Sequence, residues 1–221
     1  MTLSSASTGQ LAQGWQTLQT LIDADGSAGH AMLAALARPN ALARDVADAV
    51  HALCLLHGRH PGLLEHALRR HPKGAWSGWF ELAVQAFAEE RALLVRLASA
   101  AGPLPSTPGQ AESEAAILGQ RHALDTLAAS DRNGVALGAA TALVADWRGI
   151  RAVLDAAAER FGLRYGPCGL PDDVETAIVA AAAAASPAVE RAMAFGAQQV
   201  LAQHRGLWSL LEARASARNR G

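Results

Sequence analysis

Two polar residues interrupt long apolar stripes in this sequence, and their residue types could do chemistry. Glu90 follows Phe87 by three positions, and His204 precedes Leu207 by three, in segments whose apolar residues recur every three or four positions. The pattern favours leucine at both places. A carboxylate buried without a partner costs several kcal/mol, and a buried imidazole needs partners for both ring nitrogens. Both side chains must therefore be paired in the folded protein.

A metal site or an acid–base pair is the chemistry that Glu90 and His204 would support if they face each other in the centre of a helical bundle. Asp146 lies at the edge of another apolar stripe and is a candidate third member. Inward-pointing carboxylates and histidines build the di-iron and di-manganese sites of bundles. Those sites usually carry Glu-x-x-His pairs, which this sequence lacks. We favour the alternative, a structural hydrogen bond or salt bridge completed by an arginine such as Arg91 or Arg151.

A second candidate is a cluster of five histidines: His51, His57, His60, His66 and His71. Asp48 and His51 are three residues apart, which suits two metal ligands on one helix. The helical wheel places both opposite the apolar stripe, so we expect them to be solvated. His57 precedes a glycine and is expected at a helix C-terminus, where the dipole favours it. The basic stretch 59–73 could contact an anion, but it lacks a glycine-rich phosphate loop, so we expect a solvated face.

Aromatic residues and a long loop provide the remaining candidates. Trp76, Trp79 and Phe80 form an aromatic cluster that is expected in the core, with a ligand pocket as the alternative. The segment 162–171 contains the only tyrosine and Cys168, and loops of this length are sometimes lids. No base lies near Cys168 in the sequence, so a nucleophilic role has no support.

Composition narrows the classes of function. The net charge is -1, from 19 basic and 20 acidic residues, so no overall field would attract nucleic acid or an acidic membrane. The longest apolar run, 177–185, is too short to span a bilayer. Residues 1–10 do not resemble a signal peptide, and the two cysteines form no CxxC, so we expect a cytoplasmic protein. P-loop, GxGxxG, GxSxG, HExxH and EF-hand motifs are absent.

The elements that must position these residues are all helical. Apolar spacings of three and four, separated by Gly and Pro clusters, predict nine helices. Asp172 and Glu175 form a predicted capping box at the start of one of them. The fold class is therefore an all-α multi-helix bundle with a core of three long helices. The nine ranges are 9–24, 28–37, 40–57, 61–71, 75–101, 108–130, 133–161, 172–185 and 187–216.

A single domain over residues 1–221 is the predicted organisation. The segment 102–109 contains three prolines and is the best candidate for an internal hinge. The apolar stripes of the long helices on either side of it need one another, which favours one bundle. The small-residue run 180–185 suggests close packing and is the basis on which we expect a homodimer.

Two segments carry a resemblance to known sequences. Residues 146–151 (DWRGIR), with their alanine-rich continuation to Gly162, and residues 203–208 (QHRGLW) resemble uncharacterised all-α proteins of alphaproteobacteria. The resemblance covers much of the chain and implies no activity, because such families have none assigned. In helix length the predicted bundle is also similar to ferritin-like and haem-oxygenase-like folds. The missing Glu-x-x-His pairs argue against carrying a di-iron site over from them.

The sequence thus predicts an all-α protein of unknown function that acts in interaction or ligand binding, with its cofactors unknown. The alternative is a helical-bundle metalloprotein or small-molecule enzyme that uses the inward-facing Glu90 and His204, with Asp146 as a third group. A pocket at Trp76 and Trp79 is the third hypothesis. A small-molecule ligand is compatible with each of these.

Overall fold

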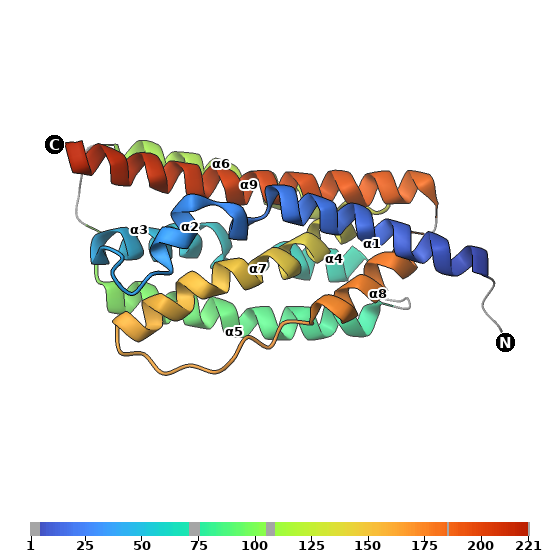
Figure 1. Cartoon of the computed structure of the whole chain (residues 1–221), viewed down its shortest axis with the longest axis horizontal. Helices are drawn as coiled ribbons and strands as arrows, with labels where there is room; N and C mark the ends of the chain where they lie inside the picture. Colours follow the sequence, from blue (N-terminus) through green and yellow to red (C-terminus); the bar gives the residue numbers. More distant parts are fainter. Residues whose placement is uncertain (1–4, 71–75, 105–108, 185, 221) are drawn as a thin grey trace.

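The computed structural model describes residues 5–70, 76–104, 109–184 and 186–220, and their side chains from residue 15 onward. Within these ranges the chain forms nine α-helices and one 3-10 helix and contains no strand, which confirms the predicted all-α class (Figure 1). The elements are α1 (Ser5–Asp25), η1 (Ser27–Gly29), α2 (Ala31–Leu36), α3 (Ala43–His57), α4 (Leu63–Arg70), α5 (Ser77–Ala101), α6 (Gln110–Ala128), α7 (Val135–Arg160), α8 (Asp173–Ala183) and α9 (Pro187–Arg220).

Most predicted helices lie within a few residues of the observed ones, and the differences occur at their ends. The predicted helix 28–37 is two elements, η1 and α2, because His30 adopts an extended conformation and caps α2 with its ring. The last helix continues to Arg220 rather than ending at 216. The capping box at Asp172 and Glu175 is present, with hydrogen bonds in both directions. Residues 105–108 of the predicted hinge, and His71, lie outside the described residues.

Helices α7 and α9 form the centre of the packing. They run side by side with α5 on the other side of α7 (Figure 1). Two glycines let their backbones approach closely. A Cβ added to Gly138 would lie 2.0 Å from the Met193 carbonyl oxygen, and one added to Gly196 would lie 2.1 Å from the Val135 carbonyl oxygen. A side chain at either glycine is sterically excluded, so this close approach depends on glycine at both positions.

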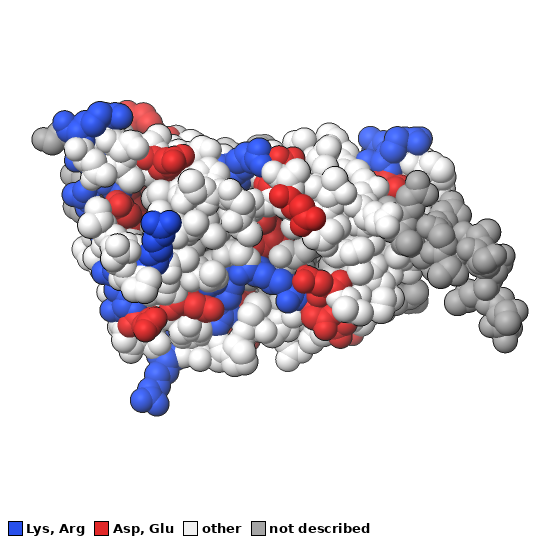
Figure 2. Space-filling view, in the orientation of Figure 1, with Lys and Arg blue, Asp and Glu red and all other residues white. Residues whose placement is uncertain are grey.

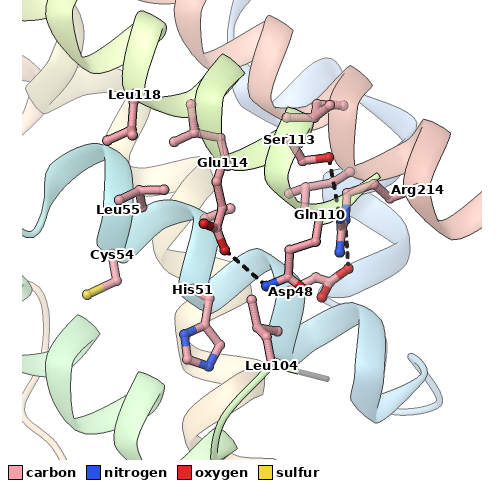
Figure 3. A pocket seen from close by; sticks show the side chains of 14 residues that line it. Asp48, His51, Cys54, Leu55, Leu104, Gln110, Ser113, Glu114, Leu118 and Arg214 are labelled. Atoms are coloured by element: carbon pink, nitrogen blue, oxygen red, sulfur yellow. Dashed lines mark hydrogen bonds and ion pairs between the residues drawn. The ribbon is translucent and has the colours of Figure 1, made fainter. Parts of the chain in front are cut away.

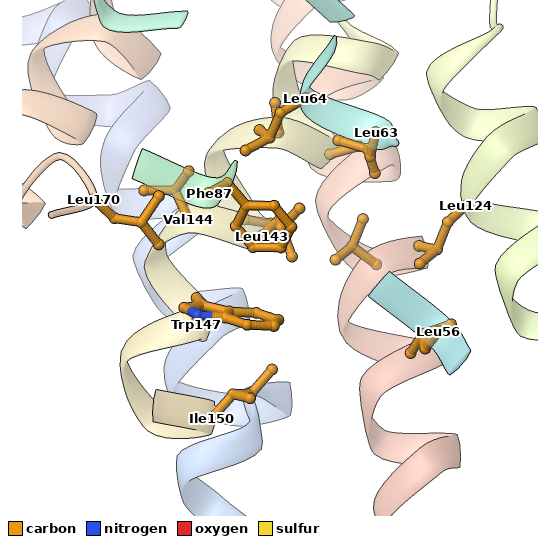
Figure 4. Packing of buried hydrophobic residues seen from close by; sticks show 14 of the residues in the cluster. Leu56, Leu63, Leu64, Phe87, Leu124, Leu143, Val144, Trp147, Ile150 and Leu170 are labelled. Atoms are coloured by element: carbon orange, nitrogen blue, oxygen red, sulfur yellow. The ribbon is translucent and has the colours of Figure 1, made fainter. Parts of the chain in front are cut away.

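Large side chains fill the space around this contact. Trp147, Trp208 and Phe80 are among the largest fully buried residues. Figure 4 shows Trp147 between Leu143 and Ile150 in the apolar cluster. Trp79 and Phe80 belong to the same core and pack edge to face, as the core interpretation of the aromatic cluster expected, while Trp76 is half-buried against it.

The distribution of charge on the surface and the location of the small-residue run 180–185 bear on which partners the protein could bind. On the face shown in Figure 2, acidic and basic side chains are interspersed. No helix among the described residues is long and apolar enough to cross a membrane. Ala180 and Ala183 are buried against neighbouring helices of the same chain, so these two alanines do not provide the external surface on which the homodimer expectation rests.

Candidate functional site

A chain of buried hydrogen bonds connects three helices in the interior. His204 of α9 lies with Nδ1 2.6 Å from Oδ2 of Asp146 on α7. Its Nε2 lies 2.9 Å from Nε2 of His57, the last residue of α3. All three side chains are buried, and His204 is 0% exposed. The arrangement connects a carboxylate to two imidazoles in series, which is a path along which a proton can be redistributed.

Ser27 holds the carboxylate end of this chain. Its backbone N–H donates to Asp146 Oδ1 and its hydroxyl to Oδ2, each over 2.6 Å. The indole N–H of Trp208 donates in turn to the Ser27 hydroxyl over 2.9 Å. The backbone at Gly26 approaches closely, because a Cβ there would lie 3.0 Å from Asp146 Oδ1. The first residue of η1 therefore directs two donors at one buried carboxylate.

These contacts change the acid–base properties of both ends. Burial alone would raise the pKa of Asp146. The hydrogen bond and the electrostatic interaction with His204 lower this pKa, as do the two hydrogen bonds from Ser27, so that it lies below the ordinary carboxyl value. The pKa of His57 is lowered well below the ordinary histidine value, first by burial and then by the neighbouring His204 and Arg91. Asp146 is therefore a carboxylate that accepts from His204, and His57 is neutral at pH 7.

Glu90 occupies a second polar cluster rather than pairing with His204. It is 2% exposed and accepts from the indole N–H of Trp147 over 2.9 Å and from the Arg151 guanidinium. The side chain of Cys168 is also hydrogen-bonded to it. Trp147 connects the two clusters, since its ring lies edge-on to His57 with 5.2 Å between centroids. The arginine partner predicted for the structural interpretation is thus Arg151.

The loop after α7 covers this second cluster. Arg151 donates to the Gly166 carbonyl and to Asp155, and its guanidinium lies over the Tyr165 ring, 4.9 Å from the centroid. A cavity of about 180 Å³ is lined by Glu90, Arg151 and Tyr165. Burial and the neighbouring Glu90 raise the pKa of the Cys168 thiol. A protonated thiol beside a carboxylate is a hydrogen-bond donor and a poor nucleophile.

The described residues contain no group of three or more His, Cys, Asp or Glu side chains that could hold a metal ion. In the chain of buried hydrogen bonds, both nitrogens of His204 are already bound, one to Asp146 and one to His57. Glu90 is engaged with an arginine and an indole. These partners correspond to the structural alternative for the inward-facing pair.

The expectation that Asp48 and His51 are solvated is wrong for Asp48, and His51 is half-buried. Asp48 is buried and binds Arg214 and Arg218, and His51 donates from Nε2 to the Gly102 carbonyl over 2.8 Å. The helical wheel failed because the end of α9 crosses the polar face of α3 and covers it. His57 ends α3 as predicted, but it points into the core and not to a solvated cap. The outer histidines pair locally: His60 with Glu65, and His66 with Arg69.

Asp48 and His51 instead line a cavity of about 430 Å³ that lies between α3, α6 and α9 (Figure 3). One wall is apolar and includes Leu55, Leu118 and Cys54, which Figure 3 shows on the same side. The remaining apolar lining consists of Ala52, Leu104, Ile117, Leu210 and Leu211. Cavities of this size with mostly apolar walls and a few convergent polar groups are typical of small-molecule sites.

Polar groups gather at the other end of this cavity, where α6 begins. Arg214 donates from Nε to Asp48 over 3.2 Å and from Nη1 to Ser113 over 3.1 Å. Gln110 donates from Nε2 to the Glu114 carboxylate over 3.0 Å. The other amide atom, Gln110 Oε1, is buried and has no hydrogen-bond partner among the described residues. Among the described residues, one residue at the polar end of the cavity, Gln110, therefore carries an unused acceptor.

Sequence reasoning missed Gln110, Ser113 and Arg214. Each is an ordinary surface residue type on a helix, and the cavity forms only when α6 and α9 lie against α3. His57 was identified as a histidine of interest but assigned to the wrong environment. A histidine followed by a glycine indicates the C-terminus of a helix, but the pattern does not show whether that end is buried or exposed.

Comparison with known proteins places most of the chain in a family. A model for a family of unknown function, DUF6975, matches residues 22–219. No curated protein and no solved structure matches the chain. The functional argument therefore depends on the geometry of the cavity and of the two buried clusters.

Proposed function

The chain belongs to the family of unknown function DUF6975, and from that premise we propose that it binds a small amphipathic molecule in the cavity between α3, α6 and α9. The ligand has an apolar body and a head that donates hydrogen bonds, such as an ammonium or hydroxyl group. The observation that carries the proposal is Gln110 Oε1, a buried acceptor that lacks a partner among the described residues and belongs to a residue lining a cavity of about 430 Å³. Buried polar atoms in folded proteins are nearly always hydrogen-bonded.

The head group follows from the donors and acceptors at the polar end. Arg214, the cation that lines the cavity, is engaged by Asp48 and Ser113. Gln110 donates its amide N–H to Glu114, which orients the amide so that Oε1 is left over. Two carboxylates, Asp48 and Glu114, line the cavity together with one arginine. An anionic head would bring a further acceptor to Gln110 Oε1, whereas a donor head satisfies the unused acceptor.

The body of the ligand follows from the apolar wall. Leu55, Ile117 and Leu211 line the cavity together with half-buried Cys54 and partly exposed Leu118. Transfer of an alkyl chain from water to such a wall is favourable by about 0.8 kcal/mol per methylene. An eight-carbon alkyl chain is a suitable probe length because it is soluble as an amine, an alcohol or a carboxylate.

The two cysteines provide a direct test. Cys54 lines the cavity and Cys168 lies beside Glu90, and both are half-buried free thiols. Octylamine and 1-octanol should slow the alkylation of Cys54 saturably while leaving Cys168 unchanged, as read by peptide mass spectrometry. Octanoate should protect Cys54 less well. Equal protection of both cysteines, or of neither, would contradict the proposal.

Two matched tryptophan variants test the location. Leu118→Trp fills the partly open edge of the cavity and should abolish protection of Cys54. Leu82→Trp is the control, because Leu82 on α5 is similarly exposed, at 43% against 40%, and does not line this cavity. Gln110→Leu should weaken the protection of Cys54 by octylamine. It should weaken protection by methyl octyl thioether less, because that control cannot donate a hydrogen bond. If Leu118→Trp leaves protection intact, the ligand lies elsewhere.

A further inference from the structure

We propose that His57 lies at the inner end of a second site, distinct from the amphipathic cavity, that binds a tetrahedral oxyanion such as a phosphoryl or sulfate group. The site is a small cleft between the end of α3, the turn that follows it, α5 and α6. Its charged lining comprises Arg59, Arg91 and Arg121, with Asp125 as the one carboxylate. Three guanidinium groups around an imidazole form an arrangement that suits anionic oxygen atoms.

The charges around the cleft are unequal. Arg91 is buried and paired with Glu65 of α4. Arg121 is half-buried, and its long contact to the Leu55 carbonyl, 3.4 Å, is a weak one. Arg59 is exposed at the outer side of the turn. Even with Glu65 counted, three cations face two carboxylates, so the cleft keeps a positive excess.

The size of the cleft limits what enters it. Its cavity is about 20 Å³, room for one water-sized group. One oxygen of an oxyanion can therefore reach His57, while the other oxygens stay at the mouth beside Arg59 and Arg121. Phe87 and Leu143 belong to the apolar part of the lining, which leaves no room for a larger inserted group. The occupant is thus the terminal group of a molecule or a free inorganic anion.

The chain of buried hydrogen bonds behind His57 makes the site responsive to protons. Charged or titratable groups face His57 from each side: His204 from α9, Arg91 from α5, and Arg121 and Asp125 from α6. Burial, His204 and Arg91 lower the pKa of His57. A bound anion opposes that effect, so binding is accompanied by proton uptake on His57 and strengthens as the pH falls.

Sulfate is the probe of choice because it does not titrate in this pH range. The assigned C2 proton resonance of His57 should shift saturably with sulfate and its apparent pKa should rise toward the ordinary histidine value. Arg121→Gln should weaken sulfate binding by about tenfold, the loss expected for one charge-assisted hydrogen bond. Arg59→Gln should weaken it less, because Arg59 is solvated. Inorganic phosphate should bind as sulfate does. Competition with a phosphate monoester then distinguishes a site for the free anion from a site for a phosphorylated molecule.

Controls distinguish a site from general charge effects. Arg132→Gln removes an exposed arginine that does not line this cleft and should leave the sulfate titration unchanged at constant ionic strength. Circular dichroism checks that each variant keeps its helices. The proposal is overturned if the His57 resonance does not respond to sulfate, if Arg132→Gln weakens binding as much as Arg121→Gln, or if acetate binds as well as sulfate. Failure here leaves the Cys54 protection test unaffected, since Cys54 does not line this cleft.

Discussion

His57 and His204 share one hydrogen bond inside the helix bundle, with their Nε2 atoms 2.9 Å apart. Such a bond needs one ring to donate and the other to accept, so it cannot persist with both rings positively charged. Because Asp146 accepts from the other nitrogen of His204, the two rings and the carboxylate form one electrostatic unit. The five predictions below follow from this unit, its neighbour Glu90, and the close contact of α7 with α9.

Replacement of Asp146 by Asn should destabilise the fold by about 2–4 kcal/mol, because it removes the charged acceptor of three donors and leaves His204 incompletely paired. Urea unfolding followed by circular dichroism measures the loss. Asp131→Asn is the control, since that side chain is 95% exposed and its pair with Arg70 lies at the surface. A similar effect of both variants would contradict the role assigned to Asp146.

Neighbouring glutamates on α5 provide a second comparison. Glu90→Gln keeps an acceptor for Trp147 but leaves the buried Arg151 without its full counter-charge, so we expect a loss of about 2–4 kcal/mol. Glu89→Gln, one residue earlier and exposed, should stay within about 0.5 kcal/mol of wild type. The measurement is the free energy of unfolding of each variant, obtained from urea denaturation. If Glu90→Gln were neutral, the buried ion pair would contribute nothing to the fold.

Stability should fall as the pH drops below about 6.5. The pKa of His57 is lower in the folded protein than in the unfolded chain, so the unfolded chain binds an additional proton between those two values. The slope from this group reaches about 1.4 kcal/mol per pH unit. His57→Gln should flatten this part of the profile, whereas His122→Gln, at an exposed position, should not. An unchanged profile in His57→Gln would be evidence against the buried neutral ring.

Asp146 affects the stability of the fold in a lower pH range than His57 does. Its pKa is held below the ordinary carboxyl value, so its stabilising contribution is complete above about pH 4 and is lost as the pH falls through the folded-state pKa. Acid unfolding monitored by tryptophan fluorescence should therefore begin at higher pH in Asp146→Asn than in wild type. A coincident transition in the two proteins would show that another group controls acid unfolding.

Glycine-to-alanine variants test the contact between α7 and α9. Gly138→Ala and Gly196→Ala each place a Cβ within about 2 Å of a backbone oxygen, and we expect losses near 3 kcal/mol or more. Gly119→Ala on α6 meets no atom within 4 Å and should stabilise the protein by about 0.5–1 kcal/mol, because alanine is the better helix former. Thermal unfolding of the three variants separates packing from helix propensity. Equal effects at all three positions would exclude close packing as the cause.

Helix positions could be predicted because they depend on local information. The spacing of apolar residues and the Gly and Pro clusters placed α5 and α7 within about two residues of their observed starts. The interior location of Glu90 and His204 was predicted by the same periodicity, because each occupies a position where the stripe requires a buried side chain. The capping box of α8 could be read directly from Asp172 and Glu175.

Partner choice could not be predicted, because it depends on residues far apart in the chain. His204 is 58 residues from Asp146 and 147 from His57, and no local pattern connects them. The inference that Glu90 faces His204 was reasonable for a simple bundle, but Trp147 and Arg151 occupy the space beside Glu90. Burial of Asp48 depends on where the end of α9 lies, which the wheel of α3 alone cannot show.

By itself the sequence determined that the chain is helical, which faces of the helices are buried, and that two polar side chains lie in the interior, because each of these depends on spacing along one helix. Only the tertiary structure decided which groups form hydrogen bonds and ion pairs with Glu90 and His204. It also decided that His57 faces inward and that α3, α6 and α9 enclose a cavity with Gln110 at its polar end. The physical reason is that hydrogen-bond partners and cavities are properties of how helices pack, and packing brings together residues far apart in the chain, as in the close α7–α9 contact at two glycines.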